Sequence, residues 1–252
     1  MIAPILSTHS LSKRFGGLVA TDTLDFDVLS GELHAVIGPN GAGKTTLIKQ
    51  LIGDLIPDAG QIIFDRVDIT RIPSYRRALL GISRSYQITS VFPEFSALEN
   101  VAIAAQAHAG HSFGIWRPTA SEDALNRPAL EFLHRVGLSA KAARLASELA
   151  HGERRQLEIA MALVSRPKLL LLDEPMAGMG RKESEAMVTL LLSLKRHYSI
   201  VLIEHDMDAV FALADRITVL VYGRRIACGA PAEIRANADV KNAYLGDGHA
   251  AH

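Results

Sequence analysis

Short continuous runs of apolar residues recur along the chain and predict strands that are buried on both faces. Such runs occupy residues 33–37, 168–172, 199–203 and 216–221. Segments with the apolar spacing of a helix follow three of these runs, at residues 47–52, 182–196 and 207–214. Strands and helices in alternation are typical of a parallel sheet that is covered by helices on both faces, so the pattern predicts an α/β fold.

A different pattern is typical of the N-terminal third of the chain. Between residues 24 and 28, apolar side chains alternate with aspartates, which predicts a strand with one buried and one exposed face. Residues 61–65, after a cluster of turn residues at 57–60, and residues 82–86 are further short strand candidates. We therefore expect an antiparallel sheet beside the parallel one.

The strand patterns are absent between residues 96 and 165, where the apolar spacing predicts helices at 97–107, 121–136 and 153–164. Residues 108–118 are rich in glycine and proline and predict an exposed loop. Trp116 in this loop is either an anchor or a contact site. We expect a single domain, residues 1–252. In it a helical part, residues 88–165, is inserted between the two parts of an α/β core, residues 1–87 and 166–252.

Composition narrows the classes of protein that fit this pattern. The 252 residues are 48% hydrophobic with a formal net charge of zero, so no basic excess indicates a nucleic-acid partner. The single cysteine, Cys228, excludes an intrachain disulfide and favours a reducing compartment, and we expect it to be a small core residue. The N-terminus lacks a signal-peptide pattern, and no run reaches the ~18 apolar residues of a membrane span. Any role at a membrane would therefore need a partner.

The stretch between the first buried strand and its helix carries the clearest chemical signal. Gly38, Gly43, Lys44 and Thr45 fit the phosphate-loop spacing GxxxxGK[ST]. Glycines permit a tight turn whose N–H groups bind phosphate oxygens, and the start of the helix adds partial positive charge. Lys44 can reach the terminal phosphates and the Thr45 hydroxyl can bind Mg²⁺. The sequence therefore predicts a nucleoside triphosphate site formed by Gly38, Pro39, Asn40, Gly41, Ala42, Gly43, Lys44, Thr45 and Thr46.

Further polar residues follow the ends of predicted strands, where α/β folds bind ligands. Asp173 and Glu174 follow the run at 168–172; beside a phosphate loop, Asp173 would hold the hydration shell of Mg²⁺ and Glu174 would be the general base. His205 could contact the γ-phosphate and orient the base, although alone it would be interpreted as a structural histidine. The amide of Gln87 can contact Mg²⁺ or water, but alone it indicates no function.

Taken together, these stretches resemble an ATP-binding cassette (ABC) ATPase, in order along nearly the whole chain. Residues 38–46 are similar to the Walker A loop, Gln87 to the Q-loop, residues 169–174 to Walker B and His205 to the switch histidine. The resemblance implies ATP and Mg²⁺ as ligands, a RecA-like parallel core sheet, a flanking antiparallel β subdomain and an inserted helical subdomain. It also implies catalytic roles for Glu174, His205 and Gln87, and metal contacts through Thr45, Gln87 and Asp173.

Residues 149–156 resemble the LSGGQ-type signature, the most specific stretch of this family. The resemblance implies that two cassettes pair head to tail, so that one signature closes on the ATP of the other. The residues that would make this contact are Leu149, His151, Gly152 and Glu153. Phe15 matches the aromatic position that stacks on adenine; the alternative is a core phenylalanine.

Two further stretches, residues 174–179 and 239–246, resemble the ATPases of branched-chain amino acid importers. This implies an ATP-hydrolysing subunit, peripheral on the cytoplasmic face of the inner (plasma) membrane. Its implied partners are transmembrane permease subunits, a second ABC ATPase subunit and, indirectly, an external solute-binding protein. Importers of other hydrophobic amino acids, of urea or of amides, a lipopolysaccharide-type exporter, and a soluble non-transport ATPase remain alternatives.

Two departures from the family pattern affect these expectations. His151 is unusual in the signature, and Gly180 occupies a position after Walker B where most cassettes have an aspartate that links the two sites of a dimer. We therefore expect a heterodimer rather than a pair of equivalent sites. A nucleotide switch without hydrolysis is the other interpretation, and the intact Glu174 and His205 argue against it. Phe92, Phe95 and Leu98 could line a groove for a partner's cytoplasmic helix, or form the core of the helical part.

Overall fold

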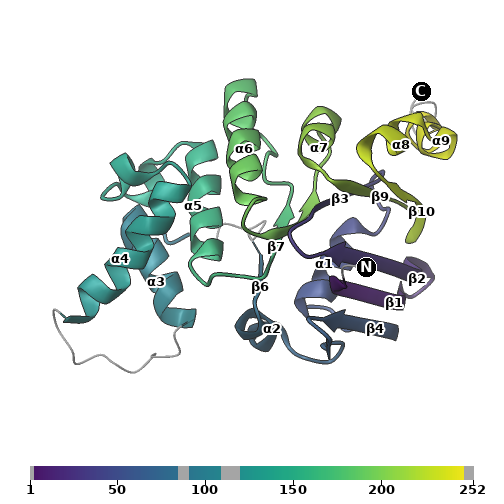
Figure 1. The fold of residues 1–252 in the computed structure, drawn as a ribbon, viewed down its shortest axis with the longest axis horizontal. Coiled ribbons are helices and arrows are strands. Elements are labelled where there is room, and N and C mark those ends of the chain that lie inside the picture. The colour runs from purple at the N-terminus through teal and green to yellow at the C-terminus, as the bar shows by residue number, and fades with distance from the viewer. Residues whose placement is uncertain (1–2, 85–90, 109–119, 247–252) are drawn as a thin grey trace.

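The computed structural model of the chain describes residues 3–84, 91–108 and 120–246. The strands in these ranges are β1 Pro4–Phe15, β2 Leu18–Leu29, β3 Leu33–Ile37, β4 Ala59–Phe64, β5 Val67–Asp68, β6 Ile82–Arg84, β7 Leu169–Asp173, β8 Ser199–Ile203, β9 Arg216–Val221 and β10 Arg224–Gly229. The α-helices are α1 Lys44–Ile52, α2 Ser74–Leu80, α3 Ala97–His108, α4 Ala120–Arg135, α5 His151–Leu163, α6 Arg181–Leu194, α7 Met207–Leu213, α8 Pro231–Ala236 and α9 Ala238–Gly246. Figure 1 shows their arrangement.

The core is a six-stranded sheet with the strand order β10-β9-β3-β8-β7-β6. The strands from β9 to β6 are parallel to one another, and β10 pairs antiparallel with β9 at one edge. Every residue of β3, β7 and β8 is buried, because helices or the second sheet cover both faces. The expected strands at 33–37, 168–172, 199–203 and 216–221 are confirmed, the second of them as 169–173.

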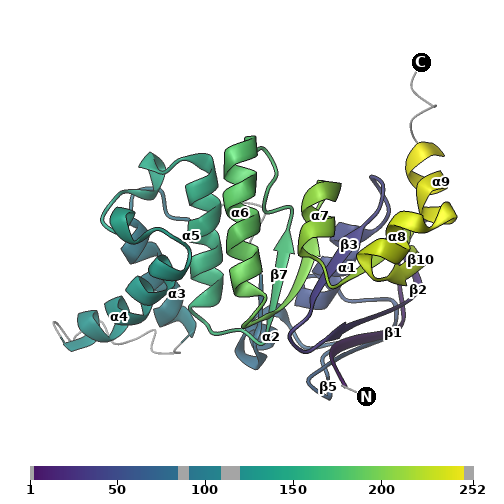
Figure 2. The same cartoon turned by 45° about the horizontal axis from the view of Figure 1, so that its top comes forward.

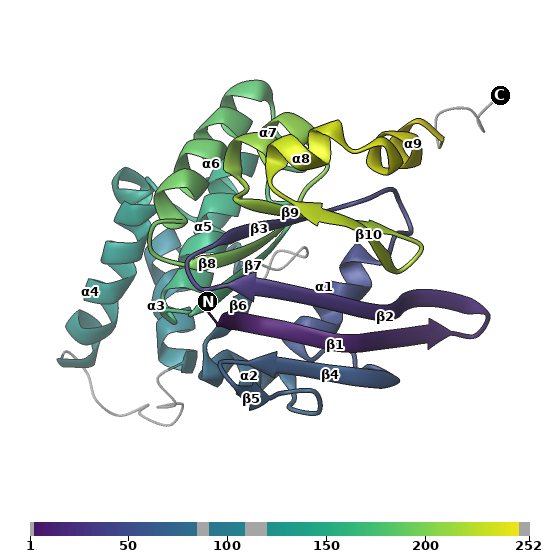
Figure 3. The same cartoon turned by 45° about the vertical axis from the view of Figure 1, so that its right-hand side comes forward.

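The second sheet is antiparallel, with the order β2-β1-β4-β5, and lies beside the core sheet (Figure 3). Helix α1 packs between the two sheets. Its Leu47, Ile48 and Leu51 share one apolar cluster with Phe26 of β2 and Phe64 of β4, and with side chains of the core sheet. The helix is therefore held from both sides, and the phosphate loop at its start is held with it.

Helices α6, α7 and α8 cover the opposite face of the core sheet (Figure 1). Apolar side chains of α6 share a second cluster with residues of β7 and β8, and α5 joins the same cluster. Figure 2 shows α5, α6 and α7 side by side over this face, with α3 and α4 beyond α5. The α/β fold class and the expected helices are confirmed, whereas the domain boundaries near residues 87 and 166 stay a prediction.

Several boundaries differ from the expected ones. Helix α5 begins at His151 rather than at residue 153, because the Glu153 carboxylate accepts a hydrogen bond from the N–H of Ala150 and caps an earlier turn. Strand β4 covers residues 59–64, and Asp65 lies in a turn with φ +48°. Strand β6 ends at Arg84 in the described region, and residues 85–86 lie outside it, as does Trp116.

Six of the described helices and strands had no clear pattern in the sequence: β1, β5, α2, β10, α8 and α9. Helix α2 owes its position to Arg77, a fully buried arginine that joins it to the end of α1. The guanidinium donates hydrogen bonds to the carbonyl oxygens of Gln50 and Leu51 in α1, and to those of Thr70 and Ile72. Burial lowers the pKa of Arg77 to about 10, which still leaves it charged. A cation at the C-terminal end of a helix also suits the helix dipole.

Candidate functional site

The phosphate loop is a tight turn that two backbone contacts shape. Gly43 precedes α1 with φ +100°, and a Cβ there would lie 2.1 Å from the carbonyl oxygen of Ala20 in β2. Gly38 has φ +153°, and a Cβ there would lie 2.1 Å from the carbonyl oxygen of Leu220 in β9. Only glycine fits either position. No side chain of the described residues caps the N-terminus of α1, so its first N–H groups are available to an anion.

Lys44 is buried and folds back over this loop. Its Nζ donates hydrogen bonds to the carbonyl oxygens of Gly38, at 2.6 Å, and Pro39, at 3.0 Å. Burial lowers the pKa of Lys44, while the carboxylates of Glu174 and Asp173 oppose that shift. The loop lysine and the two predicted acidic residues therefore lie in one site, as the strand order β3-β8-β7 requires.

Asp173 is the last residue of β7 and is 2% exposed. Its Oδ2 accepts a hydrogen bond from Nη2 of Arg84, on the neighbouring strand β6, at 2.9 Å. Oδ1 is buried and has no hydrogen-bond partner among the described residues. Burial raises the pKa of Asp173 in spite of Arg84, and Glu174 raises it further. A buried carboxylate oxygen of this kind can accept a hydrogen bond or bind a cation.

Glu174 follows β7 in the left-handed backbone region, with φ +51°. This turns its side chain toward His205, whose Nε2 lies 2.6 Å from Oε1 of Glu174. The neighbouring side chains of Asp173 and Glu174 consequently have different surroundings, one enclosed in the sheet and the other half-buried beside His205. A half-buried carboxylate that is paired with a histidine suits a base, and a buried one suits a ligand for a cation.

Glu204 is a positioning residue that the sequence patterns did not single out. It is buried, and its two carboxylate oxygens accept hydrogen bonds from the N–H groups of Met176, at 2.8 Å, and His205, at 3.0 Å. Burial raises the pKa of Glu204. The residue joins the loop that follows Glu174 to the loop that carries His205. Its one signal in the sequence is a carboxylate at the end of a buried strand, which was assigned no partner.

Residues that could hold Mg²⁺ are present, although no three His, Cys, Asp or Glu side chains cluster for a metal in the described ranges. Thr45 is exposed in the first turn of α1, and the unsatisfied Oδ1 of Asp173 lies across the site from that helix. A hydroxyl and a carboxylate are the oxygen ligands that Mg²⁺ prefers, with phosphates and water completing its shell. These residues fit a metal that arrives with a nucleotide. Gln87 lies outside the described residues.

Phe15 ends β1, and its ring is 49% exposed, which excludes the alternative of a core phenylalanine. It pairs with Leu18 across the β1–β2 hairpin. The same hairpin provides Ala20, whose carbonyl oxygen adjoins Gly43. The exposed ring therefore belongs to the β-hairpin that contacts the phosphate loop.

The signature-like residues are in a different place, at the start of α5. Nε2 of His151 lies 3.0 Å from the carbonyl oxygen of Ala177, and Gly152 packs against Glu183 of α6. Leu149 is buried beneath them, and Glu153 pairs with Lys141, which lowers the pKa of its carboxyl group. The start of α5 therefore contacts α6 and the loop that precedes it.

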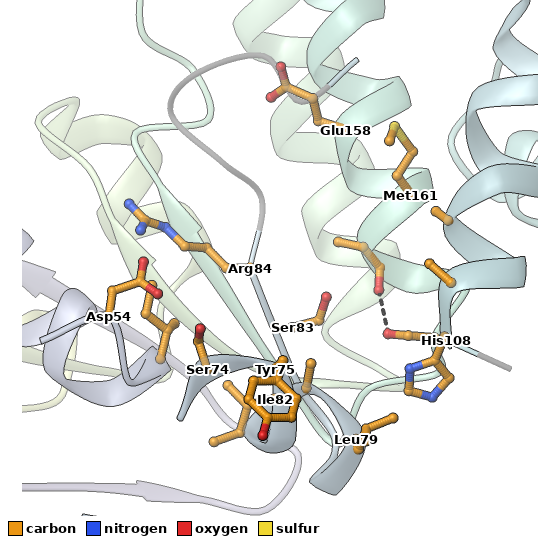
Figure 4. Close-up of a pocket in the computed structure, with 16 residues that line it drawn as sticks. Asp54, Ser74, Tyr75, Leu79, Ile82, Ser83, Arg84, His108, Glu158 and Met161 are labelled. Atoms are coloured by element: carbon orange, nitrogen blue, oxygen red, sulfur yellow. Dashed lines mark hydrogen bonds between the residues drawn. The ribbon is translucent and has the colours of Figure 1, made fainter. Parts of the chain in front are cut away.

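A cavity of about 380 Å³ separates α2 and β6 from α3 and α5. Figure 4 shows Tyr75 and Leu79 of α2 on one side and Met161 of α5 on the other. Tyr75 and Leu79 are each 63% exposed, so the cavity opens to the surface with apolar walls. Phe92, Phe95 and Leu98 do not line it: the first two are exposed and contact each other edge to face, and Leu98 packs on the core.

Comparisons with known proteins agree with this geometry. Residues 21–177 match the family model described as ABC transporter, and residues 224–250 match one described as branched-chain amino acid ATP-binding cassette transporter. The high-affinity branched-chain amino acid transport ATP-binding protein LivG of Escherichia coli K12 is 39% identical, over 98% of this chain and 100% of the relative. BraF of Pseudomonas aeruginosa, with the same description, is 38% identical over 98% of this chain and 100% of its own length.

A solved structure with the same fold is MJ1267, an ATP-binding cassette of an ABC transporter, in its ADP conformation. The TM-score is 0.86 at 29% identity, and the match covers 97% of this chain and 99% of that one. None of the helices in the described ranges of this chain has the length and hydropathy that crossing a membrane requires.

The contact between Gly43 and β2 predicts the result of adding a methyl group. Gly43→Ala should abolish measurable ATP binding, because its Cβ would meet the Ala20 carbonyl and displace the loop from the start of α1. Gly31→Ala is the matched control: φ is +77°, but no atom lies within 4 Å of the added Cβ. It should retain ATP affinity and lose only about 1 kcal/mol of stability. Titration with a fluorescent ATP analogue measures the ATP affinity of both variants. Full binding by Gly43→Ala would contradict the prediction.

Proposed function

The chain belongs to the ABC transporter family, and we propose that it is the ATP-hydrolysing subunit of an importer for branched-chain amino acids. The observation that carries the enzymatic part is the 2.6 Å contact of Glu174 with His205, beside Lys44 and the buried Asp173. The solute is inferred from full-length similarity to LivG and BraF, and from the C-terminal match at residues 224–250.

ATP would bind with its phosphates at the N-terminus of α1. The N–H groups there and the Nζ of Lys44 supply the positive charge, and Lys44 would exchange its bonds to the Gly38 and Pro39 carbonyls for phosphate oxygens. Adenine would stack on the exposed ring of Phe15. The phosphate loop would thus recognise the phosphates, and the exposed ring of Phe15 would recognise the base.

Mg²⁺ would be held by the Thr45 hydroxyl and, through its hydration shell, by Asp173, with Gln87 as a further contact. Its contribution when bound would be to neutralise negative charge on the β- and γ-phosphates. Arg84 keeps one oxygen of Asp173 occupied, so the other is the oxygen directed to this task. The hydrogen bond from Arg84 joins two charged groups, which makes it stronger than a neutral one, and it fixes the orientation of the carboxylate.

Glu174 would act as the general base for hydrolysis. It would take a proton from the water that attacks the γ-phosphorus, while the bond from that phosphorus to the bridging oxygen breaks. His205 holds the carboxylate through Nε2, and Glu204 holds the backbone of His205. The base is therefore fixed by two further residues, neither of which needs to exchange a proton with the water.

A second cassette would complete the site. The start of α5, with Leu149, His151, Gly152 and Glu153, contacts Ala177 and Glu183 of its own chain. It would supply N–H groups to the ATP of a partner. Because Gly180 lacks the carboxylate that links equivalent sites, we propose that the partner is a different cassette.

The permease subunits would dock at the cavity between α2 and α5, on the cytoplasmic face of the inner membrane. Its apolar walls suit the apolar face of a short helix from a membrane protein. Helix α2 forms one wall, and Arg77 joins α2 to the end of α1. The docking surface and the phosphate loop are thus connected through a single buried side chain.

Replacing the proposed base tests the enzymatic assignment. Glu174→Gln should bind ATP with near-normal affinity, because the amide keeps the size of the side chain, and should lose turnover by about 10²–10⁴-fold. Glu131→Gln, at an exposed position on α4, is the control and should hydrolyse normally. Phosphate release by the purified transporter complex measures turnover. Near-normal hydrolysis by Glu174→Gln would remove this residue as the base.

Charge on the wall of the cavity tests the docking surface. Leu79→Arg should reduce recovery of the permease subunits with the tagged chain at least tenfold, because the longer, charged side chain would replace part of the apolar surface on which a partner helix would pack. ATP binding should remain, since Leu79 is 63% exposed. Leu130→Arg on α4, where Leu130 is 46% exposed, should leave the complex intact. Equal recovery with both variants would place the interface elsewhere.

The oligomeric state of the purified chain tests the heterodimer. With ATP and a Glu174→Gln background that prevents hydrolysis, the chain alone should remain monomeric in sedimentation, and should form a stable pair only with a second, different cassette. A homodimer of the wild-type chain that hydrolyses ATP with strong cooperativity would contradict this proposal.

A further inference from the structure

Side chains from three adjacent strands of the core sheet form a polar cluster away from the nucleotide site. His34 lies on β3, Thr218 on β9 and Cys228 on the edge strand β10. Thr218 pairs in register with Cys228, and His34 pairs with Arg216, which is two residues from Thr218. Because residues two apart on a strand share a face, the cluster lies on one face of the sheet.

Short contacts connect the members of this cluster. The Thr218 hydroxyl lies 2.8 Å from Nε2 of His34 and 3.4 Å from Sγ of Cys228. Nδ1 of His34 lies 2.8 Å from Oε1 of Glu32, close enough for charge attraction although the ring N–H is not aligned for a hydrogen bond. Arg216 donates to the same oxygen of Glu32 at 2.9 Å. A continuous path therefore joins the thiol, the imidazole and a carboxylate.

The members differ sharply in exposure. His34 and Thr218 are fully buried, and the ring of Phe26 contacts His34 edge-on at 4.8 Å between centroids. Cys228 is exposed, so the expectation that it is a core residue is wrong. The physical reason is its position on β10, the edge strand, which pairs with β9 alone among the described strands of its sheet. An exposed cysteine on an edge strand thus adjoins a buried imidazole.

The groups around the cluster shift the pKa values of the Cys228 thiol and the His34 imidazole toward each other. Burial lowers the pKa of His34, but hydrogen bonding to Cys228 and the carboxylate of Glu32 raise it, and the net shift is upward. Burial raises the pKa of Cys228, but hydrogen bonds to His34 and Thr218 lower it, and the net shift is downward. The other charged groups nearby are Arg216, which opposes the protonation of His34, and Asp27, which pairs with Arg216.

We propose that Cys228 is a reactive thiol, activated by the buried His34 and Glu32, and a site of modification by small hydroperoxides. The sulfur would attack one oxygen of hydrogen peroxide, forming an S–O bond as the O–O bond breaks. Hydroxide leaves and takes a proton from solvent, so that the thiolate is oxidised by two electrons to a sulfenic acid and the peroxide is reduced to water. Exposure of Cys228 admits the oxidant, and the thiolate is the form that reacts.

Alkylation as a function of pH tests the activation directly, since Cys228 is the one cysteine of the chain and mass gain reports on it alone. Iodoacetamide should react with the folded chain with a midpoint pH below that of the same chain in denaturant. His34→Gln should raise the midpoint and slow alkylation at pH 7 about threefold to tenfold. His197→Gln, an exposed histidine outside the cluster, should leave the profile unchanged.

Hydrogen peroxide with dimedone provides the second measurement. Wild type should gain one sulfenic adduct, Cys228→Ser none, and His34→Gln should gain it several-fold more slowly. If His34→Gln does not fold, Glu32→Gln replaces it and should also raise the midpoint. The proposal is overturned if the midpoints of the folded and unfolded wild-type chain coincide, if the His34 and Glu32 variants leave the profile unchanged, or if peroxide yields no adduct.

Discussion

The close approach of the phosphate loop to two strands is the constraint on which the rest of the structure depends. Backbone carbonyls of β2 and β9 occupy the space where side chains at Gly43 and Gly38 would be. The loop therefore packs against a strand of each sheet. Gly43 adopts a left-handed conformation, which allows α1 to begin at Lys44. Packing of α1 between the sheets then fixes the direction in which its unpaired N–H groups point. The apolar packing of α1 thus helps to set the position of the groups that would bind an anion.

A second, smaller constraint separates the two acidic residues after β7. Neighbours on a strand normally point to opposite faces, but Glu174 has left the strand with φ +51°, a conformation that costs about 1 kcal/mol or more for a residue with a Cβ. Its N–H donates to the carbonyl of Ile203, and the next turn is tied to Glu204, so neighbouring contacts offset that strain. The result is one carboxylate enclosed beside Arg84 and one directed at His205. A strained backbone that neighbouring contacts hold in place is frequent at functional sites, and it agrees with the proposed role of Glu174 as the base.

The sequence predicted those parts of the protein that depend on local patterns. Continuous apolar runs identified β3, β7, β8 and β9, and the motifs at their ends identified Lys44, Asp173, Glu174 and His205, because parallel strands bring their carboxyl ends to one edge. Arg77, Arg84 and Glu204 were not predicted, since each is defined by partners distant in sequence: Arg84 by Asp173, Arg77 by the end of α1. The error at Cys228 has the same origin. Cysteine is a residue type that is often buried, and only the order of the strands places this one at an edge.

Contacts between residues distant in sequence also connect the cavity beside α2 with the phosphate loop at the start of α1. Tyr75 and Leu79 line the cavity from α2, and Arg77 between them points the other way, into the protein. Its bonds to the carbonyls of Gln50 and Leu51 seal the C-terminus of α1, whose N-terminus is the phosphate loop. Helix α1 has nine residues and is enclosed by two sheets, so it has little freedom to bend between its ends. A displacement of α2 that kept the bonds of Arg77 would have to move α1 with it, and the phosphate loop at the N-terminus of α1 would move as well.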